Sequence, residues 1–526
     1  MALHQGEGFG TTRRSLVVGA ALALGCSGDP SAPPDRVDAD LDGHLAEGDC
    51  DDGDPAVYPG APERCDGVDQ DCDGSPEPHV VRWTDGDGDG WGAGAEQVLC
   101  GDVPAGLVSN NLDCADADPA IHPNADEVPC AGLDANCDGT SLRPGSVALA
   151  DGPSYYDVGA ALDAAPSGAV VSVCPGLYPL SHTLTRSVTL RSFGGSAATV
   201  LQVGAGSLLT VGPGADVVVE GFTLARTEAA GTAAVVAESA DVILRDVVVS
   251  GHYGFQAALE VSGGSLTLDR SRVVDSQNWV AGGADVVISS GGGIRGVGAD
   301  ITLLDSQVAF NDAAGTGGGG LSLDGGQLVL VRSEVRGNVA AEGGGVWMTD
   351  AALVLDAASE IRGNTGARGG GVYLLRSTIS GGTIADNQQS GVLVGPGAGS
   401  ALVDLVLTGN TAVWGGGLSV EGTASLSNVS VEGNTASWLG GGLAVVESTF
   451  GDPSVTLDPA TAVVGNLSNG GGGAAWTSGE LVSLGAWWGA LGVDANEPST
   501  IGYATFEEWE VSGAGSFRCT ADGCDP

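Results

Sequence analysis

Asparagine and glycine recur at a regular spacing through the C-terminal two thirds of this 526-residue chain. Gly triplets follow four of these asparagines within six residues, and an apolar residue follows each triplet. A repeat of about 23 residues with short strands predicts one coil of a solenoid, because a single coil cannot bury its own apolar face and must stack on its neighbours. The repeating asparagines, 23 to 32 residues apart, are Asn311, Asn338, Asn364, Asn387, Asn410, Asn434 and Asn466.

Apolar and polar residues alternate within the repeats, as at 266–269, 321–324 and 429–432. One side of each such strand would fill the interior and the other would face solvent. The predicted fold is therefore all-β, a right-handed parallel β-helix over residues 145–475. A β-sandwich rich in loops is the alternative, but it would not keep so regular a period. Asn and Gly are expected at the corners, where they tolerate left-handed backbone angles, and stacked Asn side chains can form a hydrogen-bonded ladder.

Both ends of the repeat region have features typical of caps. Residues 158–165 predict a short amphipathic helix over the first coil, and 170–174 predict the first strand. This entry resembles the start of pectin-lyase-like β-helix domains. Residues 476–526 are rich in Trp and are expected to cover the last coil, which would block pairing of its edge.

The N-terminus is typical of an export signal. Arg13 and Arg14 precede a short apolar run at 16–24, which resembles a twin-arginine signal. The residues up to Cys26 resemble a bacterial lipobox, which implies cleavage over residues 1–26, lipidation of Cys26 and a tether at 27–35. We therefore expect a membrane partner through the lipid, at the outer membrane or cell surface. An ordinary signal peptide, giving a secreted protein, is the alternative.

An acidic, Cys-rich module is predicted at residues 36–141. The chain carries a net charge of −47, which argues against a nucleic-acid partner, because phosphate binding needs clustered basic residues. The module contains one unit twice: the sequence 49–55 matches 113–119, and 65–74 matches 130–139.

Each unit contains loops typical of calcium sites. Carboxylates at positions 1, 3 and 5 converge on a hard cation, Gly at position 6 permits the turn, and an acid at position 12 closes the shell. The alternative interpretation is a solvated acidic surface. The predicted metal ligands are Asp38, Asp40, Asp42 and Asp49; Asp85, Asp87, Asp89 and Glu96; Asp69, Asp71 and Asp73; and Asp134, Asn136 and Asp138.

The acidic module resembles the MopE-type metal-binding motif of surface proteins from myxobacteria and similar bacteria. The resemblance rests on the Asp-Cys-Asp-Asp sequence at 49–52, on 59–67 and on 71–74. The family name implies copper, but copper prefers His, Met and Cys ligands, and His44 is the one His within a loop. Calcium is therefore the predicted metal and copper the less favoured one. Thrombospondin type 3 repeats are similar in their Asp and Cys pattern.

The cysteines predict disulfides in an exported segment with little core. The local candidates are Cys65 with Cys72, Cys130 with Cys137, Cys100 with Cys114, and Cys519 with Cys524. Cys50 has no obvious local partner, and Cys174 is the cysteine left over, for which a buried free thiol is the alternative.

The β-helix region carries no clear catalytic motif. His182 and His252 are isolated and are interpreted as surface or turn residues, and the Arg residues between 332 and 376 are expected to pair with Glu334, Glu342 and Glu360. The favoured function is a calcium-binding structural or adhesive surface protein, with no catalysis expected and with a glycan or surface protein as its partner. The alternative is a secreted polysaccharide lyase or glycoside hydrolase acting on acidic glycans.

Overall fold

A computed structural model describes residues 37–64, 66–75, 79–100, 103–139, 141–149, 153–228, 232–278, 290–397, 399–448, 452–489, 496–497, 500–503, 508–510, 514–520 and 523–525. The chain divides into two compact units between Ala125 and Asp126. No helix in these residues is long and apolar enough to cross a membrane.

The first unit is built mainly from loops. Its described residues form an antiparallel sheet, with β1 (His79–Thr84) between β2 (Ala93–Cys100) and β3 (Leu107–Val108). The buried side chains of this unit are few and small, among them Val57, Ala61 and Ile121. Apolar burial therefore contributes little to its stability.

The second unit opens with a small cap. Helix α1 (Val158–Ala164) begins at Asp157, whose carboxylate accepts the backbone N–H of Ala160 at 2.7 Å. The predicted helix and first strand are confirmed. The strands of the cap are β4 (Val147–Leu149), β5 (Ser154–Tyr155) and β6 (Ala169–Val173).

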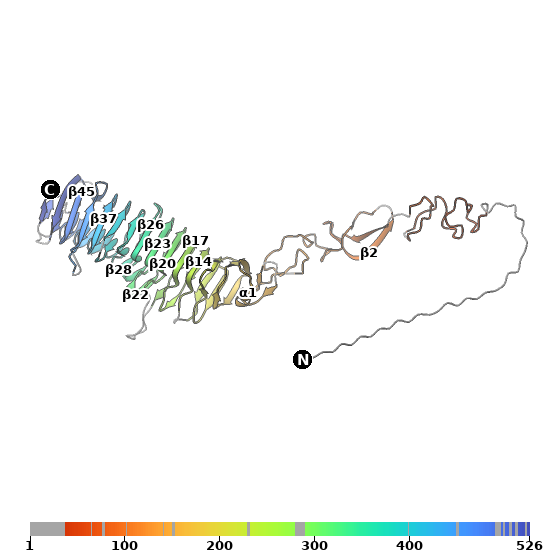
Figure 1. Cartoon of the computed structure of the whole chain (residues 1–526), viewed down its shortest axis with the longest axis horizontal. Helices are drawn as coiled ribbons and strands as arrows, with labels where there is room; N and C mark the ends of the chain where they lie inside the picture. The colour runs from red at the N-terminus through yellow and green to blue at the C-terminus, as the bar shows by residue number, and fades with distance from the viewer. Residues whose placement is uncertain are drawn as a thin grey trace, which may run out of the picture. The chain divides into compact units, whose positions relative to one another are not determined.

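The rest of the second unit is a parallel β-helix, as predicted, in which each strand pairs with the strands one coil before and one coil after it (Figure 1). The first column of strands contains β8 (His182–Leu184), β11 (Leu209–Val211), β14 (Val235–Arg245), β17 (Leu259–Asp269), β20 (Ile294–Leu304), β23 (Leu321–Val331), β26 (Val346–Leu355), β29 (Val372–Leu375), β32 (Val392–Val394), β36 (Leu418–Val420), β40 (Leu443–Val445), β44 (Ala475–Thr477) and β46 (Thr500–Tyr503).

Two further columns complete the coil. The second begins at β6, includes the C-terminal halves of β14, β17, β20, β23 and β26, and contains β9 (Val188–Ser192), β12 (Asp216–Glu220), β30 (Thr378–Ser380), β33 (Ser400–Val403), β37 (Thr423–Ser427), β41 (Ser454–Leu457) and β45 (Glu480–Trp487). The third contains β7 (Gly176–Pro179), β10 (Thr199–Val203), β13 (Thr223–Arg226), β15 (Val248–Ser250), β18 (Arg272–Val274), β21 (Gln307–Ala309), β24 (Glu334–Arg336), β27 (Glu360–Arg362), β31 (Thr383–Ala385), β34 (Val406–Thr408), β38 (Ser430–Glu432) and β42 (Ala462–Val464).

Short strands follow the third column in many coils, and antiparallel strands end the chain. The short strands are β16 (Tyr253–Gly254), β19 (Gln277–Asn278), β22 (Asp312–Gly317), β25 (Val339–Glu342), β28 (Thr365–Arg368), β35 (Thr411–Trp414), β39 (Thr435–Leu439) and β43 (Leu467–Ser468). The terminal strands are β47 (Glu508–Glu510), β48 (Ala514–Thr520) and β49 (Gly523–Asp525), with Trp488 buried against Phe517.

The Asn residues form the predicted ladder, but not because they adopt left-handed angles. At the corner before Asn364, the left-handed residue is Gly363, with φ of 62°. The side-chain oxygen of Asn387 accepts both the backbone N–H and the Nδ2–H of Asn364, at 2.9 and 3.0 Å. The same pair of bonds repeats from Asn311 to Asn466, and Asn466 bonds in this way to Asn496. These side chains are fully buried, so the ladder supplies partners for polar groups inside the coils.

Candidate metal centres

The loop at Asp38 holds its carboxylates through backbone N–H groups. Asp38 accepts the N–H of Leu41 at 2.7 Å with one oxygen and that of Gly43 at 3.1 Å with the other. Asp40 and Asp42 each accept the N–H two residues further along with Oδ1, at 3.2 and 2.8 Å. The Oδ2 atoms of these two residues therefore remain available for another partner.

The loop at Asp85 repeats this arrangement. Asp85 accepts the N–H groups of Gly88 and Gly90 at 2.7 and 3.2 Å. Asp87 accepts from Asp89 at 3.3 Å, and Asp89 accepts from Trp91 at 2.7 Å. Because Gly90 has a φ of 94°, the backbone can turn at position 6 without a Cβ penalty.

Carboxylates from each loop converge within 4.8 Å of one another. The first loop gives two overlapping groups, Asp40 with Asp42 and Asp49, and Asp38 with Asp40 and Asp52, while the second loop gives Asp85 with Asp87 and Asp89. Several oxygens near these groups are buried and have no hydrogen-bond partner. In the first unit they belong to Asp40, Asp42, Asp49, Glu63, Asp87, Asp89 and Asp113.

Electrostatic repulsion within the groups is visible in the pKa values. Burial, followed by the charges of Asp42, Asp49 and Asp38, raises the pKa of Asp40 above its ordinary value of 3.8, and the N–H of Asp42 offsets this only in part. Burial and the charge of Asp89 likewise raise the pKa of Asp87. A bound cation would remove the repulsion, because it favours the charged form of each carboxylate.

A second kind of loop follows each of these. Asp69 accepts the N–H groups of Asp73 and Gly74 at 3.2 and 2.8 Å, and Glu63 accepts the N–H of Asp71 at 2.8 Å. Glu63, Asp69 and Asp71 bring ligand oxygens together. The N–H of Asp73 lowers the pKa of Asp71, but burial and the three neighbouring carboxylates outweigh this and raise it.

The corresponding loop of the second copy lies in the second unit. Asp134 accepts the N–H groups of Asp138 and Gly139 at 3.2 and 3.0 Å. Glu127 accepts the N–H of Asn136 at 3.1 Å, as Glu63 accepts that of Asp71. The side-chain amide of Asn136 donates to Asp138 at 3.1 Å.

Glu96, the predicted position-12 ligand, lies outside the Asp85 group. It is exposed on β2, because the chain enters this strand at Ala93 and pairs with β1 instead of closing the loop. Sequence reasoning also missed Asp52, Glu63 and Glu127. The repeat alignment carried a signal for Asp52, because it places that residue opposite Asp116 in the second copy.

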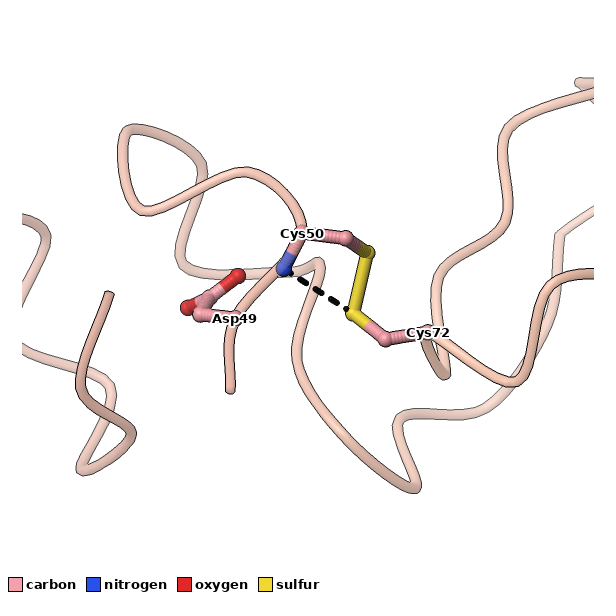
Figure 2. A group of neighbouring side chains, drawn as sticks. All are labelled: Asp49, Cys50 and Cys72. Atoms are coloured by element: carbon pink, nitrogen blue, oxygen red, sulfur yellow. Dashed lines mark hydrogen bonds between the residues drawn. A yellow bond between two sulfur atoms is a disulfide. The ribbon is translucent and has the colours of Figure 1, made fainter. Parts of the chain in front are cut away.

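Two of the expected local disulfides are wrong. Cys72 bonds to Cys50, not to Cys65, and Figure 2 shows the Asp49 carboxylate beside this disulfide. Cys130 bonds to Cys174, which ties residues before the β-helix to the end of β6. Cys519 bonds to Cys524 as expected, Cys114 and Cys137 are both disulfide-bonded, and Cys65 and the Cys100 side chain lie outside the described residues.

The donors near the loops are poor ligands for copper. The sulfur atoms of Cys50 and Cys72 lie near Asp49 but are joined to each other, so neither is a thiolate. His44 stacks on Tyr58, with ring centroids 5.0 Å apart. Met348 is buried in the β-helix. The available donors are carboxylate oxygens, which suit a hard cation.

Most of the Arg residues of the β-helix are paired, as expected. Arg336 and Arg362 contact Glu334, and Arg362 also contacts Glu360. Arg368 contacts Glu342 at 2.7 Å and also pairs with Glu421. The other two differ from expectation, because Arg332 pairs with Asp305 and Arg376 with Asp350.

His252 is not a surface residue. Its side chain is 4% exposed, and its Nε2 lies 3.3 Å from the carbonyl oxygen of Leu224. Burial lowers the pKa of His252 to about 4, so the imidazole is neutral at pH 7. The predicted signal and its Cys26 lie outside the described residues.

Two segments, residues 49–77 and 113–141, match a family model described as "Putative metal-binding motif". No curated protein matches the chain. Solved structures of similar fold include the Azotobacter vinelandii Mannuronan C-5 epimerase AlgE4 A-module, with 14% identity, a TM-score of 0.34 and coverage of 62% of this chain and 90% of that one. The periplasmic alginate epimerase AlgG gives 10% identity, a TM-score of 0.31 and coverage of 58% and 81%. The chain thus combines two segments that match this motif with a β-helix.

Proposed function

We propose that the acidic loops bind calcium. The observation that carries this proposal is the set of buried carboxylate oxygens without partners, in particular those of Asp40, Asp42 and Asp49. An unpaired buried carboxylate oxygen is costly, so a ligand that pairs with several at once is strongly favoured. Calcium accepts six to eight oxygens in a flexible geometry, which suits loops of this kind better than the strict octahedron of magnesium.

Titration calorimetry of the demetallated full chain tests this proposal. We expect heat on addition of CaCl₂ and much weaker binding of MgCl₂. Asp40→Asn should lose binding, whereas Asp54→Asn should bind normally, because Asp54 is exposed and belongs to none of the carboxylate groups. Tight binding of CuCl₂ without competition from calcium would contradict the choice of metal.

Calcium in this proposal stabilises a surface protein that displays its β-helix to a partner. The first unit has little apolar core, so cations and disulfides would replace core packing. The disulfides support export to an oxidising compartment. We propose lipidation at Cys26 as the anchor and a glycan or surface protein as the partner, and labelling cells with a palmitate analogue, with Cys26→Ser as control, tests the anchor.

A second candidate function is action on polysaccharides. It is supported by one polar cluster on the β-helix, where Arg368 lies between Glu342 and Glu421 and over the ring of Tyr373, 5.2 Å from its centroid. Release of unsaturated or reducing ends from pectin or alginate would establish this function. The activity should then disappear in Arg368→Ala and persist in Arg376→Ala, whose ion pair with Asp350 lies elsewhere on the surface.

A further inference from the structure

We propose that Asp113 and Asp116 complete the second cation site, so that a cation there joins the loop between β1 and β2 to the segment that follows β3. This inference rests on the proposed calcium binding and deepens it. In place of Glu96, which is exposed on β2, it assigns two carboxylates that follow β3 in sequence.

Asp113 has the burial and the free oxygen of a metal ligand. Its side chain is 7% exposed, and its Oδ2 is buried with no partner. The other oxygen accepts the N–H of Ala115 at 2.7 Å, and the backbone N–H of Asp113 donates to the carbonyl of Gly92 at 3.1 Å. The residue is therefore fixed beside the end of the Asp85 loop.

The first copy makes the same contacts, but there the residues that make them lie close together in sequence. There, Asp49 accepts the N–H of Asp51 at 2.9 Å, as Asp113 accepts that of Ala115. Asp52 accepts the N–H of Ala39 at 3.0 Å, in the same way that Asp116 accepts the N–H of Gly86 at 2.8 Å. Because Asp49 and Asp52 each belong to a carboxylate group of the first loop, the equivalent pair is assigned to the second.

Electrostatics agree with this placement. The charge of Asp113 contributes to the raised pKa of Asp87, after burial and the charge of Asp89. The two carboxylates are therefore close enough to repel each other in the absence of a cation. The matched family segments also begin at Asp49 and Asp113, which supports their equivalence.

The second site differs from the first because β2 and β3 separate its ligands in sequence. In the first copy, the closing Asp49 follows Asp42 almost directly, whereas β2 and β3 separate Asp89 from Asp113. A cation bound by both segments would fix the loop between β1 and β2 to the segment that follows β3. Asn110 already bridges these segments, because it donates to the carbonyl of Gly90 at 3.2 Å and accepts from Gly92 at 3.1 Å.

Terbium luminescence of the full chain tests the assignment. Tb³⁺ substitutes for calcium, and Trp91, whose N–H donates to Asp89, would sensitise an ion in this site. We expect Trp91→Phe to remove most of this emission. Asp113→Asn and Asp116→Asn should weaken the sensitised binding by about tenfold or more, and Glu96→Gln should leave it unchanged.

A protease measurement covers the case in which a variant misfolds. Arg82 on β1 is the one tryptic site between Arg64 and Arg143, so its cleavage reports on the hairpin. Calcium should slow cleavage at Arg82 in the wild type and in Glu96→Gln, but not in Asp113→Asn. Normal terbium binding by Asp113→Asn, or a loss confined to Glu96→Gln, would overturn this inference alone. No calcium or terbium binding by the wild type would overturn the proposed function as well.

Discussion

The two units differ in whether their buried polar groups have hydrogen-bond partners. In the β-helix, the amide of Asn387 donates to the carbonyl of Ile361 and to Asn410, and it accepts twice from Asn364. In the first unit, carboxylates such as Asp40 and Asp113 are held by backbone N–H groups and keep one buried oxygen without a partner. The ladder thus satisfies its own polar groups, whereas under the proposed function cations would supply the partners that the acidic unit lacks.

The largest expected effect comes from breaking the Asn ladder. Asn387→Ala would remove the bonds that Asn387 accepts from the backbone N–H and Nδ2–H of Asn364 and the bond that it donates to the carbonyl of Ile361, at a cost of about 4 kcal/mol in the free energy of unfolding. Denaturant unfolding followed by intrinsic fluorescence measures this. Asn469→Ala is the control, because Asn469 is exposed and should change stability by less than about 0.5 kcal/mol. A similar loss in both variants would contradict the role of the ladder.

Asp87→Asn is expected to change the stability of the first unit in opposite directions in chelator and in calcium. In chelator the substitution should stabilise the first unit, because it removes a carboxylate whose pKa burial and Asp89 raise. In calcium at 100 times its dissociation constant, it should destabilise that unit by up to about 2.7 kcal/mol through lost binding. Melting curves with and without calcium measure the change in stability under both conditions. Destabilisation by Asp87→Asn in chelator would contradict the repulsion between Asp87 and Asp89.

The ladder and the alternating strands were predictable because each repeats many times, and a periodic pattern survives local errors. The Asp85 site was predictable only in part, because a twelve-residue loop pattern assumes local closure. The hairpin carries Glu96 away, and the equivalence of Asp49 with Asp113 is the signal that sequence could have used. The disulfides of Cys50 and Cys130 could not be predicted, because their partners depend on how loops without periodicity fold.

A pH effect is expected in the β-helix through His252. Its folded pKa of about 4 lies below the ordinary 6.5, so the unfolded state binds the proton first as the pH falls. Stability is complete above pH 6.5 and should decrease by up to about 3 kcal/mol between pH 6.5 and pH 4. The His252→Gln variant should lack this loss of stability between pH 6.5 and pH 4. A pH dependence equal to that of the wild type would contradict the role of His252.

The smallest effect is expected for a surface ion pair. Arg332 contacts Asp305 at 2.6 Å and lowers the pKa of its carboxyl group, but both side chains are about half exposed. Asp305→Asn should therefore reduce stability only slightly, and added salt should diminish the difference. A loss comparable to that of Asn387→Ala would show that surface pairs, and not the ladder, dominate the stability of the β-helix.

Hydrogen–deuterium exchange of the full chain in calcium and in chelator tests the central comparison most directly. We expect chelation to accelerate exchange in the acidic loops, at amides such as those of Gly43 and Gly90 that donate to carboxylates. Exchange in the β-helix should remain unchanged. Equal protection of the loops in both buffers, or a calcium effect concentrated in the β-helix, would contradict the account.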